Sequence, residues 1–172
     1  IVALSVASIL LLVALPSYGP FVSQSRVDTV TNQLISTVSI ARSEAIKRGQ
    51  AVAVCSKNAD PAQTCVPAAN GAQNWSDGWI VFTDADDNQV AAANEIIKVF
   101  GNLDDASTVQ FSNGTTMVFD SLGLLSTASV NDETFTVGDN LDAAMGAGLS
   151  VTPTGRIRTC KNWSVSSATC SD

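Results

Sequence analysis

The sequence contains no histidine, and only 15% of its 172 residues are charged. Histidine is the commonest general base and metal ligand at neutral pH, so its absence removes the usual partner of a nucleophilic serine. A pair of carboxylates for acid–base chemistry cannot be identified either, because nearly every Asp falls in an expected turn or helix. We therefore expect no catalytic residue, no metal site and no cofactor, and the chain is not predicted to be an enzyme.

Basic residues are scarce as well, with nine Lys and Arg against 16 Asp and Glu and a net charge of -7. A globally acidic protein binds polyanions poorly, so binding of nucleic acid would need a local basic patch. The candidate patch consists of Arg156 and Arg158 with Lys161 just beyond them. On a strand the two arginines point to the same face, where they could hold phosphates or the carboxylates of a partner. The alternatives are a strand kept soluble by charge and pairing with Asp residues of this chain.

The four cysteines form two close pairs in the sequence, Cys55 with Cys65 and Cys160 with Cys170. Four cysteines permit three connectivities, and spacing alone does not choose among them. Structural zinc sites favour a narrower C-x₂₋₄-C spacing. We therefore prefer two local disulfides, which indicate an oxidising compartment such as a periplasm or a cell surface.

The chain begins with an uncharged apolar run from Ile1 to Leu15, closed by Pro16. About 20 such residues are needed to span a membrane, so the run is slightly too short to do so alone. No basic residue precedes it and no small-residue cleavage site follows, so it is not typical of a secretory signal. We interpret it as part of a longer apolar helix that the mature protein keeps. The residues expected to bury this helix in a membrane or a filament are Ile1, Leu4, Ile9, Leu12, Leu15 and Pro16.

Beyond Pro20 the apolar residues follow helical spacing up to about residue 48. Basic residues gather in the last turns and Gly49 follows them, which is a normal helix stop. We predict one long helix over residues 1 to about 48, apolar first and amphipathic later, and disturbed at Pro16 and at Gly19-Pro20. The apolar residues of its second half are Val27, Val30, Leu34, Ile35, Val38 and Ala41.

From Ala51 onward short segments alternate with period two and are separated by Gly, Asn and Asp. No long helix separates them, so we predict a mainly antiparallel sheet and an α+β fold. The expected domains are 1–24 (apolar half of the helix), 25–50 (amphipathic half) and 51–172 (disulfide-bonded β head). The predicted strands are AVAVCS, GWIVFTD, EIIKVFG, TVQFS, TMVFD, ETFTV, GLSVTP and GRIRTC.

Two further segments have competing interpretations. The loop from Asp84 to Asn88 has oxygen ligands at alternating positions, but it lacks the Gly and the closing Glu of a calcium loop. We predict a solvated hairpin tip there. Trp75 and Trp79 are interpreted as core residues rather than a ligand platform, and Gly78 between them is expected to supply an unusual backbone angle.

These elements together resemble type IV pilins and the pseudopilins of type II secretion. More specifically, the chain resembles the GspH/FimT/FimU group of minor pilins. The segments that carry the resemblance are 41–45 (ARSEA), 52–55 (VAVC), 75–84 (WSDGWIVFTD) and 153–160 (PTGRIRTC). The resemblance implies a long N-terminal helix packed on a β head and a structural subunit of a type IV pilus or pseudopilus. Such a subunit is anchored in the bacterial inner membrane and then assembles with other pilin subunits into a periplasmic or extracellular filament.

The resemblance also favours a minor subunit that primes assembly over a major subunit of the shaft. The Gly-Arg-x-Arg element resembles the one associated with DNA binding in FimT-type pilins of natural transformation. This implies a possible role in DNA uptake for Arg156 and Arg158.

Overall fold

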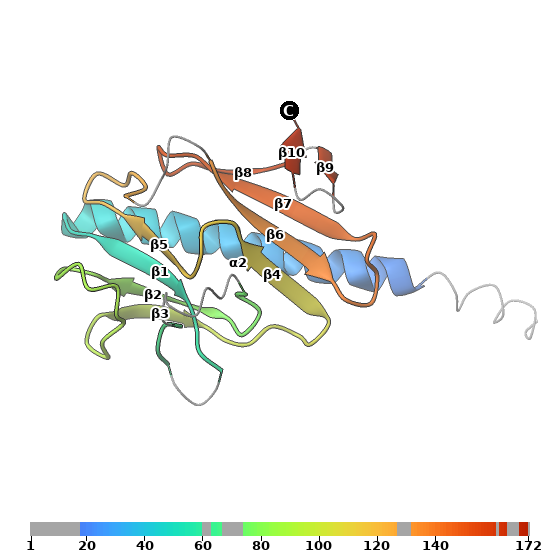
Figure 1. The fold of residues 1–172 in the computed structure, drawn as a ribbon, viewed down its shortest axis with the longest axis horizontal. Helices are drawn as coiled ribbons and strands as arrows, with labels where there is room; N and C mark the ends of the chain where they lie inside the picture. Colours follow the sequence, from blue (N-terminus) through green and yellow to red (C-terminus); the bar gives the residue numbers. More distant parts are fainter. Residues whose placement is uncertain are drawn as a thin grey trace, which may run out of the picture.

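The computed structural model describes residues 18–59, 63–66, 74–126 and 132–160, and the backbone of 162–164 and 169–171. Its long helix, α2 (Tyr18–Arg48), runs along the long axis of the molecule and packs against strands of two antiparallel sheets (Figure 1). The predicted α+β class is confirmed. The strands are β1 (Val52–Ser56), β2 (Trp79–Thr83), β3 (Ile96–Phe100), β4 (Ser107–Phe111), β5 (Thr116–Phe119), β6 (Glu133–Asp139), β7 (Gly146–Val151), β8 (Ile157–Thr159), β9 (Asn162–Ser164) and β10 (Thr169–Ser171).

The buried face of α2 is the stripe that the sequence predicts. Its side chains recur every three or four residues, the period that keeps one helix face toward a core. Of the predicted apolar residues only Ile35 is half-buried, while Asp28 and Ser36 on other faces are exposed. The buried members of the stripe are Val27, Val30, Leu34, Val38, Ala41 and Ala45.

The two ends of α2 differ from each other. Gly19 and Pro20 lie inside the helix, which runs through them without interruption, so the disturbance expected there is not a break. Residues 1–17, including Pro16, lie outside the described residues. The other end stops at Gly49, whose backbone φ of 63° is left-handed and whose N–H donates to the Ala45 carbonyl at 2.9 Å.

The strands form two four-stranded sheets, β3-β2-β1-β5 and β4-β6-β7-β8, and a small pair, β9-β10. Every pairing between these strands is antiparallel, as predicted. The pair β9-β10 is the part of the sheet structure that the sequence patterns did not predict. The β6–β7 turn lies at one end of the molecule, and the β7–β8 turn lies at the other end with the C-terminus of α2 (Figure 1).

An aromatic cluster fills the space between the helix and the sheets. Trp75 is fully buried and its ring lies 5.3 Å from that of Phe111 and 5.1 Å from that of Phe135. Trp79 is also fully buried, so both tryptophans are core residues. Gly78 has a φ of 96°, and a Cβ there would collide with the backbone of Phe100, which explains why the position requires glycine.

Among the described residues, no helix combines the length and the apolarity that a membrane crossing requires. The apolar run of residues 1–15, on which the membrane prediction rests, lies outside them.

Candidate binding surface at the C-terminal end of the helix

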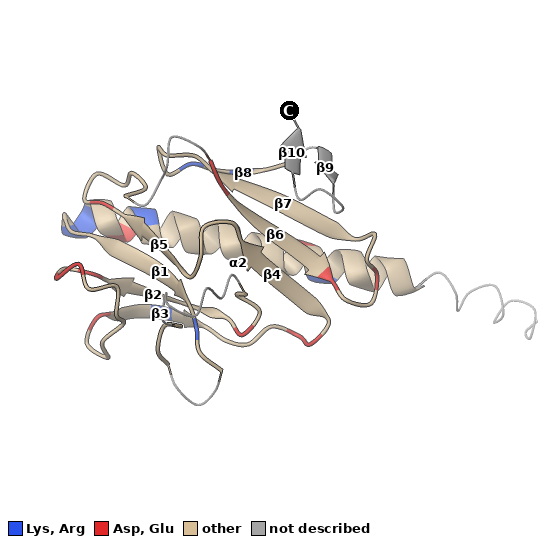
Figure 2. Cartoon of the chain, viewed as in Figure 1, with Lys and Arg blue, Asp and Glu red and all other residues tan. Residues whose placement is uncertain are grey.

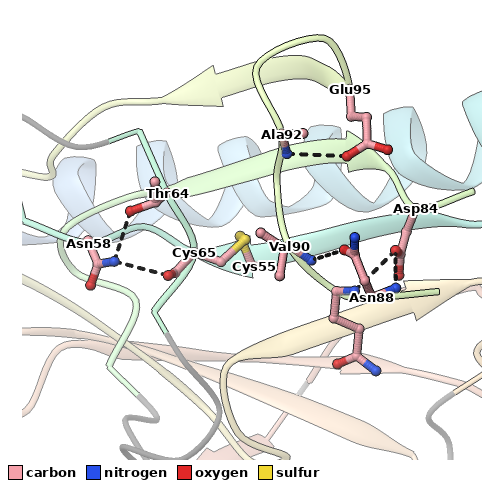
Figure 3. The surroundings of a disulfide bond; sticks show 10 residues. Cys55, Asn58, Thr64, Cys65, Asp84, Asn88, Val90, Ala92 and Glu95 are labelled. Atoms are coloured by element: carbon pink, nitrogen blue, oxygen red, sulfur yellow. Dashed lines mark hydrogen bonds between the residues drawn. A yellow bond between two sulfur atoms is a disulfide. The ribbon is translucent and has the colours of Figure 1, made fainter. Parts of the chain in front are cut away.

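A disulfide joins β1 to the loop that follows it, as predicted for Cys55 and Cys65. The two Cα atoms lie 5.5 Å apart. Asn58 fastens the same loop, because its side-chain amide donates to the Thr64 hydroxyl and to the Cys65 carbonyl (Figure 3). Cys160 is disulfide-bonded. The side chain of Cys170 lies outside the described residues, so the pairing of Cys160 with Cys170 stays a prediction.

The acidic loop after β2 is a hairpin tip, but its first carboxylate is not solvated as expected. Asp84 is 2% exposed, and its Oδ1 accepts the backbone N–H groups of Asn88 and Gln89 at 3.0 and 3.1 Å (Figure 3). Burial raises the pKa of the Asp84 carboxyl above its usual range. Asp84 therefore organises the turn from inside. No cluster of His, Cys, Asp or Glu within the described ranges could hold a metal ion.

The residues of the predicted basic patch have different surroundings in the structure. The strand β8 begins at Ile157, whose half-buried side chain packs on the core, with exposed Arg156 and Arg158 on either side of it. Nη2 of Arg158 lies 3.3 Å from Oδ2 of Asp132, so the interpretation of intramolecular pairing is confirmed for this arginine. Lys161 lies outside the described residues.

Arg156 belongs to a tight turn rather than to the strand. Its N–H donates to the Thr152 hydroxyl at 3.2 Å, and its carbonyl accepts the Thr152 N–H at 2.9 Å. The preceding Gly155 has a φ of 72°, which an L side chain rarely adopts. The predicted strand GRIRTC is therefore a turn up to Arg156 and a strand only from Ile157 to Thr159.

Two glycine turns hold the side chain of Arg42 on α2. A Cβ at Gly155 would collide with the Gly123 carbonyl oxygen and lie 3.2 Å from Cδ of Arg42. Gly123, in the loop after β5, has a φ of 75°, and its carbonyl accepts a 3.2 Å hydrogen bond from Nε of Arg42. The sequence segments ARSEA and PTGRIRTC thus meet in space. The two segments are far apart in the sequence, and only the positions of the two glycines indicate that they approach each other closely.

Arg42 and Arg156 line one surface hollow of about 360 Å³ between α2 and the β7–β8 turn. Neither arginine has a salt bridge among the described residues, whereas Arg26, Lys47, Arg48 and Arg158 all do. Figure 2 shows basic residues both at this end of α2 and beside β8. We call this hollow the arginine hollow. The residues that line it are Val38, Ser39, Arg42, Ser43, Ile46, Gly155, Arg156 and Ile157.

The opposite end of the molecule is acidic and apolar. Arg26 bridges Asp104 at 3.3 Å and Asp139 at 3.7 Å, which ties α2 to the ends of the second sheet. Backbone hydrogen bonding from Leu141, followed by the Ser23 side chain, holds the pKa of the Asp139 carboxyl below its usual range despite its burial.

Large apolar side chains are exposed at this same end. Phe21 on α2 is 74% exposed and Leu141 in the β6–β7 turn is 73% exposed. Pro20 and Val22 flank Phe21 in the sequence. They line a hollow beside the helix together with Arg26, Leu141 and Asp142. This apolar end is where α2 extends beyond the strands (Figure 1).

A helix packed on antiparallel sheets, with a disulfide-bonded β head, is the architecture of a pilin-like subunit. The chain belongs to the family of the type II transport protein GspH, whose model matches residues 30–155. No curated protein has a sequence significantly similar to this chain.

Solved structures with the same fold are minor pilins and pseudopilins. The type IV minor pilin FimU of Pseudomonas aeruginosa aligns with a TM-score of 0.55 and 18% identity over 77% of this chain and 90% of FimU. The minor pseudopilin EpsH of the Vibrio cholerae type 2 secretion system aligns with a TM-score of 0.53 and 12% identity over 78% of this chain and 95% of EpsH. At these identities the likeness is one of fold. Pilins and pseudopilins are structural proteins, and the chain is therefore a structural protein and not an enzyme.

Proposed function

We propose that this chain is a minor subunit of a type IV pilus or a type II pseudopilus, held in the bacterial inner membrane until it enters a filament. Membership of the GspH family over residues 30–155 carries the proposal. The likeness to a minor pilin and a minor pseudopilin supports the minor role over a major shaft role.

The physical basis of assembly is burial of apolar helix surface. Residues 1–15 are uncharged and apolar, and α2 continues toward them with Phe21 and Val22 exposed. Burial of apolar surface is worth roughly 25 cal/mol per Å², whether lipid or neighbouring helices cover it. A subunit can therefore move from the membrane into a helical bundle without exposing this surface to water.

Immunogold electron microscopy of the full-length protein in its native envelope tests the proposal. We expect label on a thin filament or at its tip, and copies per filament, counted by quantitative mass spectrometry, far below those of the most abundant subunit. Dispersed monomers in the membrane would refute the filament role, and thousands of copies per filament would refute the minor one.

DNA uptake is the second candidate function. It is favoured by Arg156, which is exposed and has no salt bridge within the described part of the chain. Arg158 is already neutralised by Asp132, so few phosphates would be contacted and binding would be weak. Log affinity for DNA would fall with log salt by roughly 0.7 to 0.9 per phosphate contact. The test is fluorescence anisotropy at two salt concentrations with the chain and its Arg156→Ala/Arg158→Ala variant. Equal binding by the two proteins would remove the arginines from this role.

A further inference from the structure

The arginine hollow is open, and no part of the chain that the structure describes fills it. In a protein with a net charge of -7, four described cations pair with a carboxylate, namely Arg26, Lys47, Arg48 and Arg158. Arg42 and Arg156 have no salt bridge among the described residues, and they line the same hollow. The two residues line the hollow from different elements, Arg42 from α2 and Arg156 from the β7–β8 turn. Arginine presents a planar fork of donors that matches a carboxylate or a phosphate.

The geometry of Arg42 is fixed before any ligand arrives. Its Nε is engaged by the Gly123 carbonyl at 3.2 Å, and Gly155 packs against its stem. The rest of the guanidinium group has no hydrogen-bond partner of its own among the described residues. A donor that is held in place loses little conformational entropy on binding, which favours a specific contact.

The lining of the hollow favours a protein ligand over nucleic acid. Val38, Ile46 and Ile157 contribute apolar surface, and Ile46 is 51% exposed. Two more exposed leucines, Leu122 and Leu124, flank Gly123 in the loop that holds Arg42. The sugar–phosphate backbone offers little apolar surface to such a rim, whereas a peptide with an acidic residue beside a large apolar one offers both kinds of group.

We propose that the arginine hollow binds the β6–β7 turn of a second copy of this chain, with the Asp142 carboxylate between Arg42 and Arg156 and Leu141 against Ile46. This inference rests on the proposed function. Leu141 is 73% exposed, and Asp142 has no salt bridge among the described residues. The Oδ1 atom of Asp142 accepts the Ala144 N–H at 3.1 Å, which leaves further lone pairs of the carboxylate for a partner.

The two surfaces lie at opposite ends of the molecule (Figure 1), so one copy cannot satisfy both from within. A contact between different surfaces of identical subunits is heterologous. In the proposed minor subunit, the contact of hollow and turn would join the heads of the few copies that a filament holds.

Zero-length crosslinking of the Arg156→Lys variant tests the contact. A carbodiimide couples an amine to a carboxylate only when the two groups touch. The full chain is produced in ¹⁴N and ¹⁵N forms, mixed in detergent, crosslinked and mapped by mass spectrometry. We expect a mixed-isotope crosslink between position 156 and Asp142. The same mapping is applied to the chain in its membrane and to any sheared filament fraction.

The Arg158→Lys variant is the matched control, because Arg158 contacts Asp132 of its own chain at 3.3 Å. It should give a crosslink to Asp132 within one isotope form. If this control reacts and position 156 gives no crosslink between copies, or one to a carboxylate other than Asp142, the inference is overturned. Absence of the chain from every filament would refute the proposed function instead, while the crosslink in detergent still decides the contact.

A charge exchange provides the second readout. Arg156→Asp and Asp142→Arg should each weaken self-association, measured by analytical ultracentrifugation of the full chain in detergent, by about tenfold. The double variant should regain part of the loss, because opposite charges again face each other at positions 142 and 156 while Arg42 still repels the arginine introduced at position 142. Additive losses in the double variant would overturn the inference. So would loss of salt-dependent DNA binding in Arg156→Asp with unchanged self-association, because the hollow would then be a phosphate site.

Discussion

The indole N–H of Trp79 donates a 2.8 Å hydrogen bond to the hydroxyl of Thr37, and both side chains are buried between α2 and β2. The Thr37 hydroxyl in turn donates to the Gln33 carbonyl at 2.8 Å. One threonine on the helix thus satisfies the indole N–H of a tryptophan from the first sheet. This buried contact favours the observed position of the helix against the sheet, because a buried indole N–H without an acceptor would be costly.

Removing that acceptor should destabilise the fold. Thr37→Val keeps the shape and leaves the Trp79 N–H buried without a partner, which costs about 1–3 kcal/mol. Urea unfolding followed by circular dichroism measures the loss. Thr29→Val is the control, since Thr29 makes the same type of bond to the Ser25 carbonyl on an exposed face. Equal losses for the two variants would show that the indole bond contributes nothing.

Glycine is required at position 155 for two reasons that a matched pair of variants separates. Gly49→Ala meets only the cost of a left-handed φ, about 1–2 kcal/mol, because nothing lies within 4 Å of its added Cβ. Gly155→Ala meets a similar φ cost and also drives the β7–β8 turn away from Gly123 and Arg42. We expect at least twice the loss in unfolding free energy for Gly155→Ala. Equal losses for the two variants would mean that the β7–β8 turn accommodates the added Cβ at no cost in free energy.

Two buried carboxylates should affect stability with opposite dependence on pH. The pKa of Asp84 is raised, so its folded form favours the proton and its contribution falls as pH rises from 3.8 through the raised value. The pKa of Asp139 is lowered, so its contribution is present above 3.8 and is lost as pH falls through the lowered value. Unfolding of Asp84→Asn and Asp139→Asn in urea between pH 3 and 7 checks both signs. Relative to the wild type, Asp84→Asn should gain stability toward pH 7 and Asp139→Asn should lose it.

The two predicted disulfides can be examined separately. Replacing both Cys55 and Cys65 by Ala should cost about 2–3 kcal/mol, because the bond closes a short loop and restricts the unfolded chain. Thermal or urea unfolding measures this loss. Peptide mapping without reduction should find Cys160 linked to Cys170. Any linkage of Cys160 to Cys55 or Cys65 would contradict both pairings.

The elements that could be predicted from the sequence are those encoded by local patterns. The stripe on α2 follows from spacing, and the strands follow from alternation between turn residues. The short β9 and β10 lack enough residues for a period to show. The prediction of a strand through Arg156 was wrong at that residue, because Gly155 and Thr152 form a turn there.

The candidate site was predictable only in part. The sequence indicated Arg156 and Arg158, but it contained no sign that Asp132 would neutralise one and leave the other free. The approach of Gly155 to Arg42 joins segments distant along the chain, and no local pattern encodes such a contact. The sequence shows a glycine at position 155, but it does not show that this glycine packs against Arg42.

The buried stripe of α2 has a mechanical consequence. From Val27 to Ala45 the helix lies in the same core as both sheets, so a tensile load applied at its N-terminal end spreads as shear over the whole helix–sheet contact. Close-packed interiors transmit strain rather than absorb it. The head would therefore resist being pulled off its helix, and stretching under load would be confined to the part of the helix that the sheets do not cover.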